Sequence, residues 1–212
     1  MEVWLFASGF WEIDMERTGY LVDHQNLPGD YPTQLLPGDF WEQLGRTVAT
    51  FGFLEETLGK AIFSLTATRS YQDDEIAEAY EKWLPTLRRA VSDPFGCLIY
   101  QYAKALKAHD DVNLENPDDL VTDLREAARL RNVICHGSWR APDENGASLP
   151  FFITPKMLIF ETRIDPKHLR QTRTHVVELI CAVINSVTHM GWQFPGTAGP
   201  GEVIYRSTRA KP

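Results

Sequence analysis

The chain has 212 residues, of which 43% are hydrophobic and 24% are charged, and its formal net charge at pH 7 is −8. These values describe a folded globular protein that can bury a sizeable core. The acidic balance argues against a protein that coats nucleic acid through overall positive charge, although it is compatible with a local basic cleft. Because the N-terminus has no basic signal-peptide region and no apolar run is long enough to cross a membrane, we expect a cytoplasmic protein with no membrane partner.

The first 37 residues are rich in Trp, Phe, Gly and Pro, and they predict an N-terminal arm. Residues 3–6 and 10–13 are typical of short strands, and a loop follows around Pro28 and Pro32. The composition is compatible with two roles for this arm. It either packs against the rest of the chain, which we favour, or presents aromatic side chains to a partner.

A long helix is predicted over residues 40–65, because apolar side chains recur there every three or four positions. Its predicted core stripe consists of Leu44, Val48, Phe51, Leu58 and Ile62. Glu55 falls inside this stripe. A carboxylate on a packing surface needs a cation or several donors, so Glu55 predicts a charged partner on a neighbouring helix.

Two shorter helices are predicted next. The first runs from about residue 73 to Leu84, and Pro85 is expected to kink it or end it. Its acidic side chains predict a solvated face. The second runs from residue 93 to about residue 108, and its predicted core positions are Leu98, Ile99, Tyr102 and Leu106.

The next predicted helix, residues 120–136, carries most of the polar chemistry of the chain. Asn116 supplies an N-cap, Pro117 suits the first turn, and the two aspartates after it complement the positive end of the helix dipole. Gly137 is a residue type that is common just after a helix C-terminus. These signals predict where the helix begins and where it ends.

The side chains of this helix sort into two stripes. The apolar stripe consists of Leu120, Leu124, Ala127, Ala128, Ile134 and Cys135, and the polar stripe consists of Arg125, Arg129, Asn132 and His136. Arg131 falls in the middle of the apolar stripe, where its permanent charge needs an anion. Since Glu55 has the complementary need on its own helix, we predict that the Glu55 and Arg131 side chains form an ion pair.

After Gly137 the pattern changes to short alternating segments. Residues 138–141, 149–154 and 156–162 are typical of strands, and the Asp-Glu-Asn-Gly run at residues 143–146 is a turn signal. Together they predict a small β-hairpin or three-strand insertion, at about residues 138–163, before the last helix.

The last helix is predicted from Asp165 to about Met190, with a polar and basic first half that we expect to be solvated. Its predicted core face consists of Leu169, Val176, Ile180, Val183, Ile184 and Val187. The predicted fold class is therefore mainly α: an up-and-down helical bundle over residues 38–194, between the arm at 1–37 and a flexible tail at 195–212. Basic side chains of that tail are Arg206, Arg209 and Lys211.

The cysteines and the motif search indicate neither a metal nor a cofactor. Cys97, Cys135 and Cys181 are far apart in apolar helical contexts, which predicts reduced core cysteines. The sequence contains no Cys-x-x-Cys pair, no His-Glu-x-x-His motif, no Gly-x-Ser-x-Gly elbow and no phosphate loop. We therefore expect chemistry that needs no metal.

Arginine and histidine together supply what phosphodiester cleavage without a metal requires. Arginine offers a forked donor to phosphate oxygens, and histidine exchanges a proton near neutral pH. In RNA the 2′-hydroxyl is an internal nucleophile, so one base, one acid and one charge clamp suffice. The helix over residues 120–136 ends in such a cluster, with Arg131, Asn132 and His136.

Residues 131–136 read Arg-Asn-Val-Ile-Cys-His, which resembles the Arg-Asn-x-x-x-His form of the Arg-x(4–6)-His signature of HEPN domains. The layout of residues 38–190 is also similar to that family: a long first helix with an internal glutamate, middle helices, the motif helix and a long last helix. The resemblance implies a helical bundle that forms a homodimer, with the motif helices of both protomers at a shared cleft. For active members it also implies metal-independent endoribonuclease activity, often in toxin–antitoxin systems or antiviral defence.

Carried over to this sequence, the resemblance implies that Arg131 and His136 are the catalytic pair. It also implies that Asn132 is an auxiliary polar residue and that Glu55 is a supporting carboxylate. RNA is then the expected substrate, and an antitoxin or inhibitor protein is an expected partner. We add Arg129, because it shares the stripe of His136 and is the cation with easier access to phosphate if Arg131 is tied to Glu55.

An alternative function is a non-catalytic helical module that binds a nucleotide or a protein and uses the same cluster structurally. In that case Arg131 and Glu55 are only an ion pair, and His136 only complements the negative end of its helix dipole. Ser138 stands where many toxins of the family have a tyrosine that their antitoxin modifies, which argues against that kind of pairing. The remaining histidines are expected at the surface or at edges, and they include His109, His168, His175 and His189.

Overall fold

The computed structural model of the chain describes residues 19–70, 72–154 and 156–196, so the strands predicted at 3–6 and 10–13 and the basic side chains of the tail lie outside the described residues. The chain divides into two compact units, Met1–Gln34 and Leu35–Pro212. The described part of the first unit contains one short 3-10 helix, η1 (His24–Asn26). The Asp23 carboxylate caps it by accepting the Gln25 backbone N–H at 3.1 Å.

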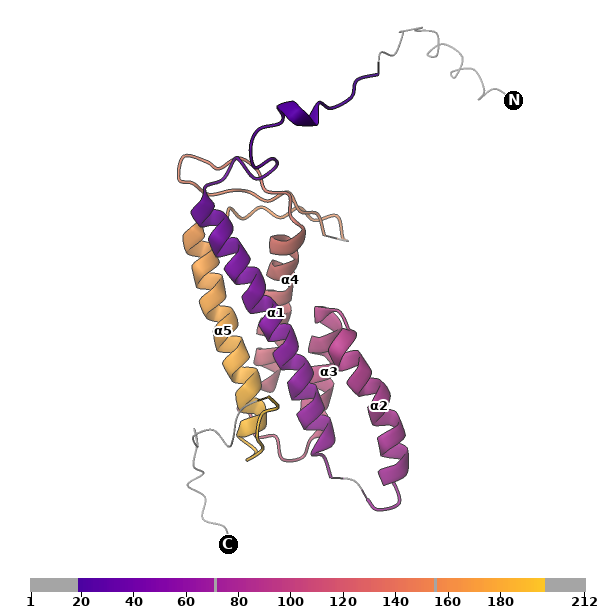
Figure 1. Cartoon of the computed structure of the whole chain (residues 1–212). Coiled ribbons are helices and arrows are strands. Elements are labelled where there is room, and N and C mark those ends of the chain that lie inside the picture. The colour runs from indigo at the N-terminus through magenta and orange to yellow at the C-terminus, as the bar shows by residue number, and fades with distance from the viewer. Residues whose placement is uncertain (1–18, 71, 155, 197–212) are drawn as a thin grey trace, which may run out of the picture. The chain divides into compact units, whose positions relative to one another are not determined.

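The second unit is mainly α. Its described residues form α1 (Gly38–Ala67), α2 (Ile76–Ser92), α3 (Phe95–Ala108), α4 (Pro117–His136) and α5 (Pro166–Thr188). Helix α1 is the central element, because it contacts each of the other four helices, and Figure 1 shows α5 on one side of it and α2 on the other. The prediction of a mainly α fold is confirmed. None of the described helices is long and apolar enough to cross a membrane.

The core forms where the apolar stripes of the helices meet. In α1 the predicted positions Phe51, Leu58 and Ile62 are buried, whereas Val48 is exposed, so the prediction is wrong there. All four predicted core positions of α3 are buried. The buried phenol of Tyr102 donates to the Ser186 hydroxyl at 2.9 Å and thereby ties α3 to α5. In α5 the predicted face is buried throughout except at Ile184, which is half-buried.

Helix α2 differs from its prediction at both ends. It begins at Ile76, and it continues through Pro85 to Ser92 rather than ending near Leu84. A proline inside a helix removes one backbone donor and frees the carbonyl one turn earlier. Pro85 and Glu81 are both exposed, so water can hydrate that carbonyl and the helix tolerates the proline.

The insertion between α4 and α5 does not form regular strands in its described residues. Three isolated antiparallel bridges take their place, Ser138 with Phe151, Ser148 with Ile164, and Ile153 with Ile159. The predicted three-strand arrangement is therefore not shown. Prolines explain part of the difference, because Pro142 and Pro150 have no N–H to donate and a hydrogen-bond ladder cannot run through them.

The last helix begins as the sequence predicts. Asp165 stands at the N-cap of α5, and its carboxylate accepts the His168 backbone N–H at 2.6 Å. This cap fixes the point at which the insertion returns to the bundle, since Ile164, directly before it, is fully buried.

Candidate functional site

Helix α4 carries the motif, and its boundaries follow from local sequence. Pro117 occupies the first turn, and Asp118 and Asp119 lie there as predicted. Asn116 is at the N-cap position, but its side chain makes no capping hydrogen bond, so that detail of the prediction is wrong. The helix ends at His136, which places this imidazole at the negative end of the dipole.

Gly137 ends α4 for a reason that the sequence does not reveal. Its φ is −70°, which any residue can adopt, so backbone freedom does not require a glycine here. A Cβ at this position would lie 2.5 Å from the Val133 carbonyl oxygen and 2.9 Å from the Pro150 Cβ. Glycine is therefore needed for space, and the insertion packs directly against the helix turn that carries His136.

The predicted ion pair between Glu55 and Arg131 is confirmed. One guanidinium nitrogen of Arg131, Nη2, lies 3.0 Å from Oε1 of Glu55, and the two side chains are 28% and 25% exposed. A second nitrogen, Nη1, donates to the Asn132 side-chain oxygen at 3.3 Å. The pair joins α4 to α1 and holds the guanidinium in place while part of it stays accessible to solvent.

The other predicted site residues lie on the exposed side of α4. Arg129, Asn132 and His136 are spaced at three and four residues, and all three are exposed. Among the described residues, the side chains of Arg129 and His136 make no hydrogen bond and no ion pair. The structure thus brings Glu55, Arg131 and Asn132 together and leaves the imidazole and the second guanidinium directed to solvent.

The prediction that the cysteines are core residues is wrong, because Cys97, Cys135 and Cys181 are all free and exposed. Partial burial nevertheless raises the pKa of the Cys135 thiol, an effect that Arg131 opposes and Glu55 reinforces. The thiol therefore stays protonated near neutral pH and is a poor nucleophile. The buried face of α4 consists instead of Val121, Leu124, Ala127, Val133 and Ile134.

His109 is also placed differently from its prediction. It is buried rather than at the surface, with 5% of its area exposed. Its Nε2 lies 3.1 Å from the Thr68 hydroxyl, and its Nδ1 accepts the Asp111 backbone N–H at 3.2 Å. Because Nδ1 accepts, the proton of the neutral ring is on Nε2 and is donated to Thr68. His109 is a structural link between the C-terminal ends of α1 and α3.

Glu55 also borders a groove that sequence reasoning missed. This groove has a volume of about 580 Å3 and is lined by α1, by the α2–α3 corner and by Pro195. Among its lining residues are Glu55, Glu56, Asp93 and Lys60. Hydrophobic periodicity does not predict this groove, because the segment after α5 that returns to α1 has no repeating pattern.

The described residues contain no group of three or more His, Cys, Asp or Glu side chains that could hold a metal ion. The site therefore consists of one held guanidinium, one amide, one exposed imidazole and one exposed guanidinium. No protein-family model, no curated protein and no solved structure matches this chain.

Proposed function

We propose that this chain is a metal-independent endoribonuclease whose active site is shared between two copies of α4. The observation that carries the proposal is the held guanidinium of Arg131, 3.0 Å from Glu55, in a helix that ends five residues later in the exposed His136. A guanidinium has five N–H donors. Glu55 and Asn132 engage two of its nitrogens, and the remaining donors are available to the oxygens of a phosphodiester.

The proposed reaction is transesterification by the RNA 2′-hydroxyl. His136 of one protomer removes the 2′-hydroxyl proton, and the oxygen attacks the adjacent phosphorus. The bond to the 5′-oxygen breaks, and the imidazolium of the second His136 protonates that leaving oxygen. The products are a 2′,3′-cyclic phosphate and a 5′-hydroxyl. Arg131 stabilises the charge that develops on the non-bridging oxygens.

The shared site follows from the roles that the reaction requires. Base and acid must act on opposite sides of the phosphorus, and one exposed imidazole cannot occupy both positions. A homodimer with a twofold axis places two identical polar stripes face to face. The exposed stripe of Arg129, Asn132 and His136 has the polarity that such a substrate-binding interface needs.

Arg129 is the proposed phosphate contact outside the catalytic pair. It is exposed, and among the described residues it has no carboxylate partner, whereas Arg131 is held by Glu55. Arg129→Ala should therefore weaken RNA binding similarly for different RNA sequences and reduce its salt dependence, with a smaller effect on the chemical step.

The test is RNA cleavage in EDTA by the unsubstituted chain and by His136→Ala. His175→Ala is the matched control, because His175 is an exposed histidine on α5 that pairs with Glu178 at 3.5 Å. We expect cleavage to disappear in His136→Ala and to persist in His175→Ala, with equal thermal unfolding by circular dichroism. Absence of cleavage on every RNA tested, or unaltered cleavage in His136→Ala, would overturn the proposal.

The oligomeric state provides a second test. Gel filtration with light scattering should give the mass of two chains. An excess of His136→Ala chains, allowed to exchange with the unsubstituted chain, should suppress its activity, because a mixed dimer has a single His136. The mass of one chain at working concentration would remove the shared site. An active enzyme of this kind would degrade cellular RNA, as a toxin or a defence effector does, so expression of the unsubstituted chain should slow growth.

A second candidate function is a non-catalytic helical module. The observation that favours it is that Arg131 is already satisfied by Glu55 and Asn132, as a purely structural ion pair would be. In that case Arg131→Ala lowers stability and no RNA is cleaved by any variant. The EDTA assay therefore separates the two candidates.

A further inference from the structure

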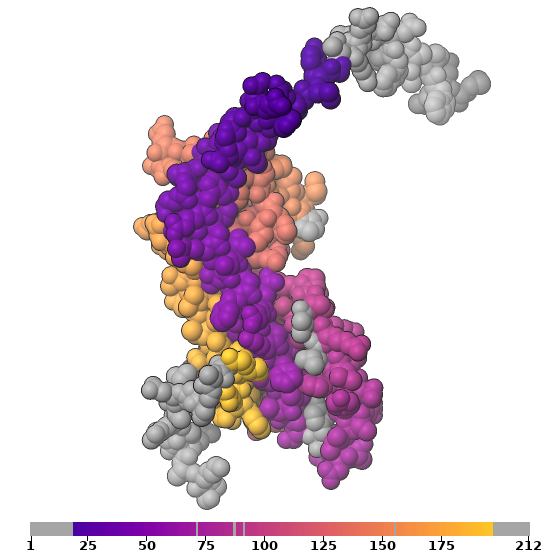
Figure 2. Space-filling model, viewed as in Figure 1, coloured from indigo at the N-terminus to yellow at the C-terminus, as the bar shows by residue number. Residues whose placement is uncertain are grey.

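Helices α1 and α2 both line two grooves that follow one another along the same seam, and Figure 2 shows the two helices side by side on one face of the molecule. The first is the groove that Glu55 borders. The second has a volume of about 220 Å3, and it is lined by Thr66, Ala67, Ile76, Ala79, Tyr80 and Trp83. Phe63 connects them, because it lines the first groove and its ring lies 5.6 Å from the Trp83 ring, which lines the second.

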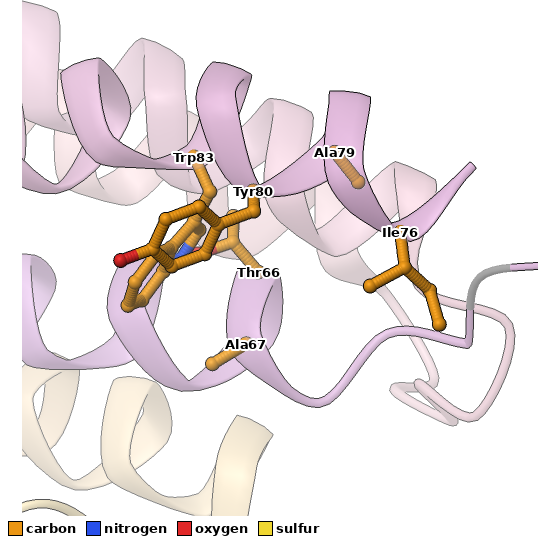
Figure 3. Close-up of a pocket in the computed structure, with 6 residues that line it drawn as sticks. All are labelled: Thr66, Ala67, Ile76, Ala79, Tyr80 and Trp83. Atoms are coloured by element: carbon orange, nitrogen blue, oxygen red, sulfur yellow. The ribbon is translucent and has the colours of Figure 1, made fainter. Parts of the chain in front are cut away.

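The second groove is apolar and preorganised. The Trp83 ring is held in place by a hydrogen bond, since its indole N–H donates to the Thr66 hydroxyl at 3.1 Å. Tyr80 and Trp83 lie with their ring centres 6.1 Å apart, and Figure 3 shows both rings on the Thr66 side of the groove. Tyr80 and Ile76 keep 55% and 54% of their area exposed. The volume is below the several hundred Å3 that a small-molecule site usually has, and it suits one or two side chains of a peptide.

The rim of this groove is acidic where α2 begins. At the end of the groove where α2 begins, three exposed carboxylates directly precede Ile76, and they belong to Asp73, Asp74 and Glu75. Glu78 and Glu81 are also exposed, but helical periodicity places them on the opposite face of α2 from Ile76, Tyr80 and Trp83. Lys82 is a cation within this stretch, and it is paired with Glu78. An occupant that complements both the groove and its rim must carry apolar side chains next to several positive charges.

The chain itself approaches this seam. Pro195 lines the first groove, and Gly196 lies so near α1 that a Cβ on it would be 3.0 Å from the Lys60 ammonium nitrogen. Thr66, at the second groove, is about 9 Å further along the same helix. Residues 197–203 could span about 23 Å when extended, so the residues beyond them have the reach to arrive at the second groove.

The sequence beyond that point has the required chemistry. Residues 203–205 are Val-Ile-Tyr, and the positive side chains that follow are Arg206, Arg209 and Lys211. We propose that residues 203–211 of this chain dock on their own α1–α2 seam. The Val-Ile-Tyr segment enters the groove formed by Ile76, Tyr80 and Trp83, and the basic side chains pair with the acidic rim. This proposal does not depend on the ribonuclease activity.

The test is disulfide trapping in the full chain, with the native cysteines replaced by serine. Ile204→Cys is combined with Ala79→Cys, which lines the groove, or with Ala77→Cys, which is exposed on the same helix outside it. Two cysteines can be joined only when their Cβ atoms come within about 4.5 Å. We expect the bond with position 79 to form at least about tenfold faster than the bond with position 77, because docking raises the effective concentration at the groove.

Two further measurements make the result decisive. Asp73→Asn with Asp74→Asn and Glu75→Gln should bring the two rates together, because the rim no longer attracts the basic side chains. In the chain without added cysteines, amide hydrogen exchange across α2 should become faster when Arg206, Arg209 and Lys211 are each changed to glutamate. Equal rates at positions 77 and 79, a predominance of cross-linked dimers over intramolecular bonds, or unchanged hydrogen exchange would each overturn docking within one chain.

Discussion

Helix α1 contacts two of its neighbours in opposite ways within about one helical turn. At Glu55 it meets α4 through two long charged side chains, whose nearest atoms are 3.0 Å apart. At Gly59 it meets α2 through the backbone alone, because a Cβ there would lie 2.5 Å from the Ala90 carbonyl oxygen. One contact depends on the presence of side chains, and the other depends on the absence of one.

The difference determines how each contact responds to change. Long side chains have several rotamers, so the Glu55–Arg131 pair can persist if the helices shift by a fraction of an ångström. The contact at Gly59 has no such freedom, because the Ala90 carbonyl cannot turn aside as a side chain can, so an added side chain must push the two helices apart there. The candidate catalytic guanidinium is thus attached by an adjustable contact, and the wall of the α1–α2 seam by a rigid one.

The largest expected effect comes from filling the backbone contact. Gly59→Val should lower the free energy of unfolding by about 3 kcal/mol, because the added carbons overlap the Ala90 carbonyl and force α2 outward. Urea denaturation measures this loss, and hydrogen exchange should show its largest increase in α2. A loss smaller than about 0.5 kcal/mol, the usual range of a surface substitution, would show that the two helices separate without cost.

Breaking the charged contact should cost less. Glu55→Gln and Arg131→Met should each lower the free energy of unfolding by about 1–2 kcal/mol, and a double-mutant cycle should give a coupling energy of about 1 kcal/mol that shrinks in 1 M salt. The matched control is the pair of Arg46 with Glu42, which has a similar distance of 2.9 Å but side chains that are 62% and 56% exposed.

For that exposed pair we expect a coupling of about 0.3–0.5 kcal/mol, as in other pairs spaced four residues apart on a helix. If the coupling energy of Glu55 and Arg131 is no larger than that of Arg46 and Glu42, the partial burial of the Glu55–Arg131 pair does not strengthen it. The ion pair would then position the guanidinium without stabilising the bundle.

A second glycine of α1 sharpens the comparison with an effect of the opposite sign. Gly52 lies one heptad before Gly59, and a Cβ there would have nothing within 4 Å. Gly52→Ala should therefore raise the free energy of unfolding by about 0.5–1 kcal/mol, since alanine has the higher helix propensity. A destabilising Gly52→Ala would indicate that this face of α1 is covered in solution, and light scattering of the two proteins would then show whether a second chain covers it.

The charged contact could be predicted from the sequence, and the backbone contact could not. Glu55 and Arg131 each interrupt an apolar stripe, and an uncompensated charge on a packing surface restricts its partners to a few residues. Gly59 gives no such signal, since Gly45 and Gly52 look the same in the sequence and face open space. The distance between α1 and α2 depends on how the whole bundle packs, which no local pattern contains.

The candidate site divides in the same way. The contact between Arg131 and Glu55 follows from helical periodicity, and so does the polar stripe of Arg129, Asn132 and His136, whereas the hydrogen bond from Arg131 to Asn132 does not. The burial of individual side chains of α4 cannot be predicted in this way, because it depends on which other segment packs over each one. Val133 and Cys135 differ in this respect. Gly137 leaves room for Pro150 of the insertion beside the last turn of α4, where Val133 is buried and Cys135 is exposed.

The smallest expected effect is a shift in the pH dependence of Cys135 alkylation, which reports on the Glu55–Arg131 ion pair. With Cys97 and Cys181 replaced by serine, the rate of alkylation of Cys135 should rise with pH later than that of a free thiol, because partial burial raises its pKa. Arg131 lowers this pKa and Glu55 raises it. Glu55→Gln should therefore move the pH profile down, and Arg131→Met should move it up.

The same shift has a consequence for stability. A thiol with a higher pKa in the folded chain loses its proton first in the unfolded chain, so its contribution to stability is present below the ordinary thiol pKa and declines as the pH rises above it. Cys135→Ser should remove this part of the alkaline loss. Profiles that move in the same direction in both charge variants would mean that the thiol responds to a general loosening of α4 rather than to the two charges, and the adjustable contact would then be weaker than its distance of 3.0 Å implies.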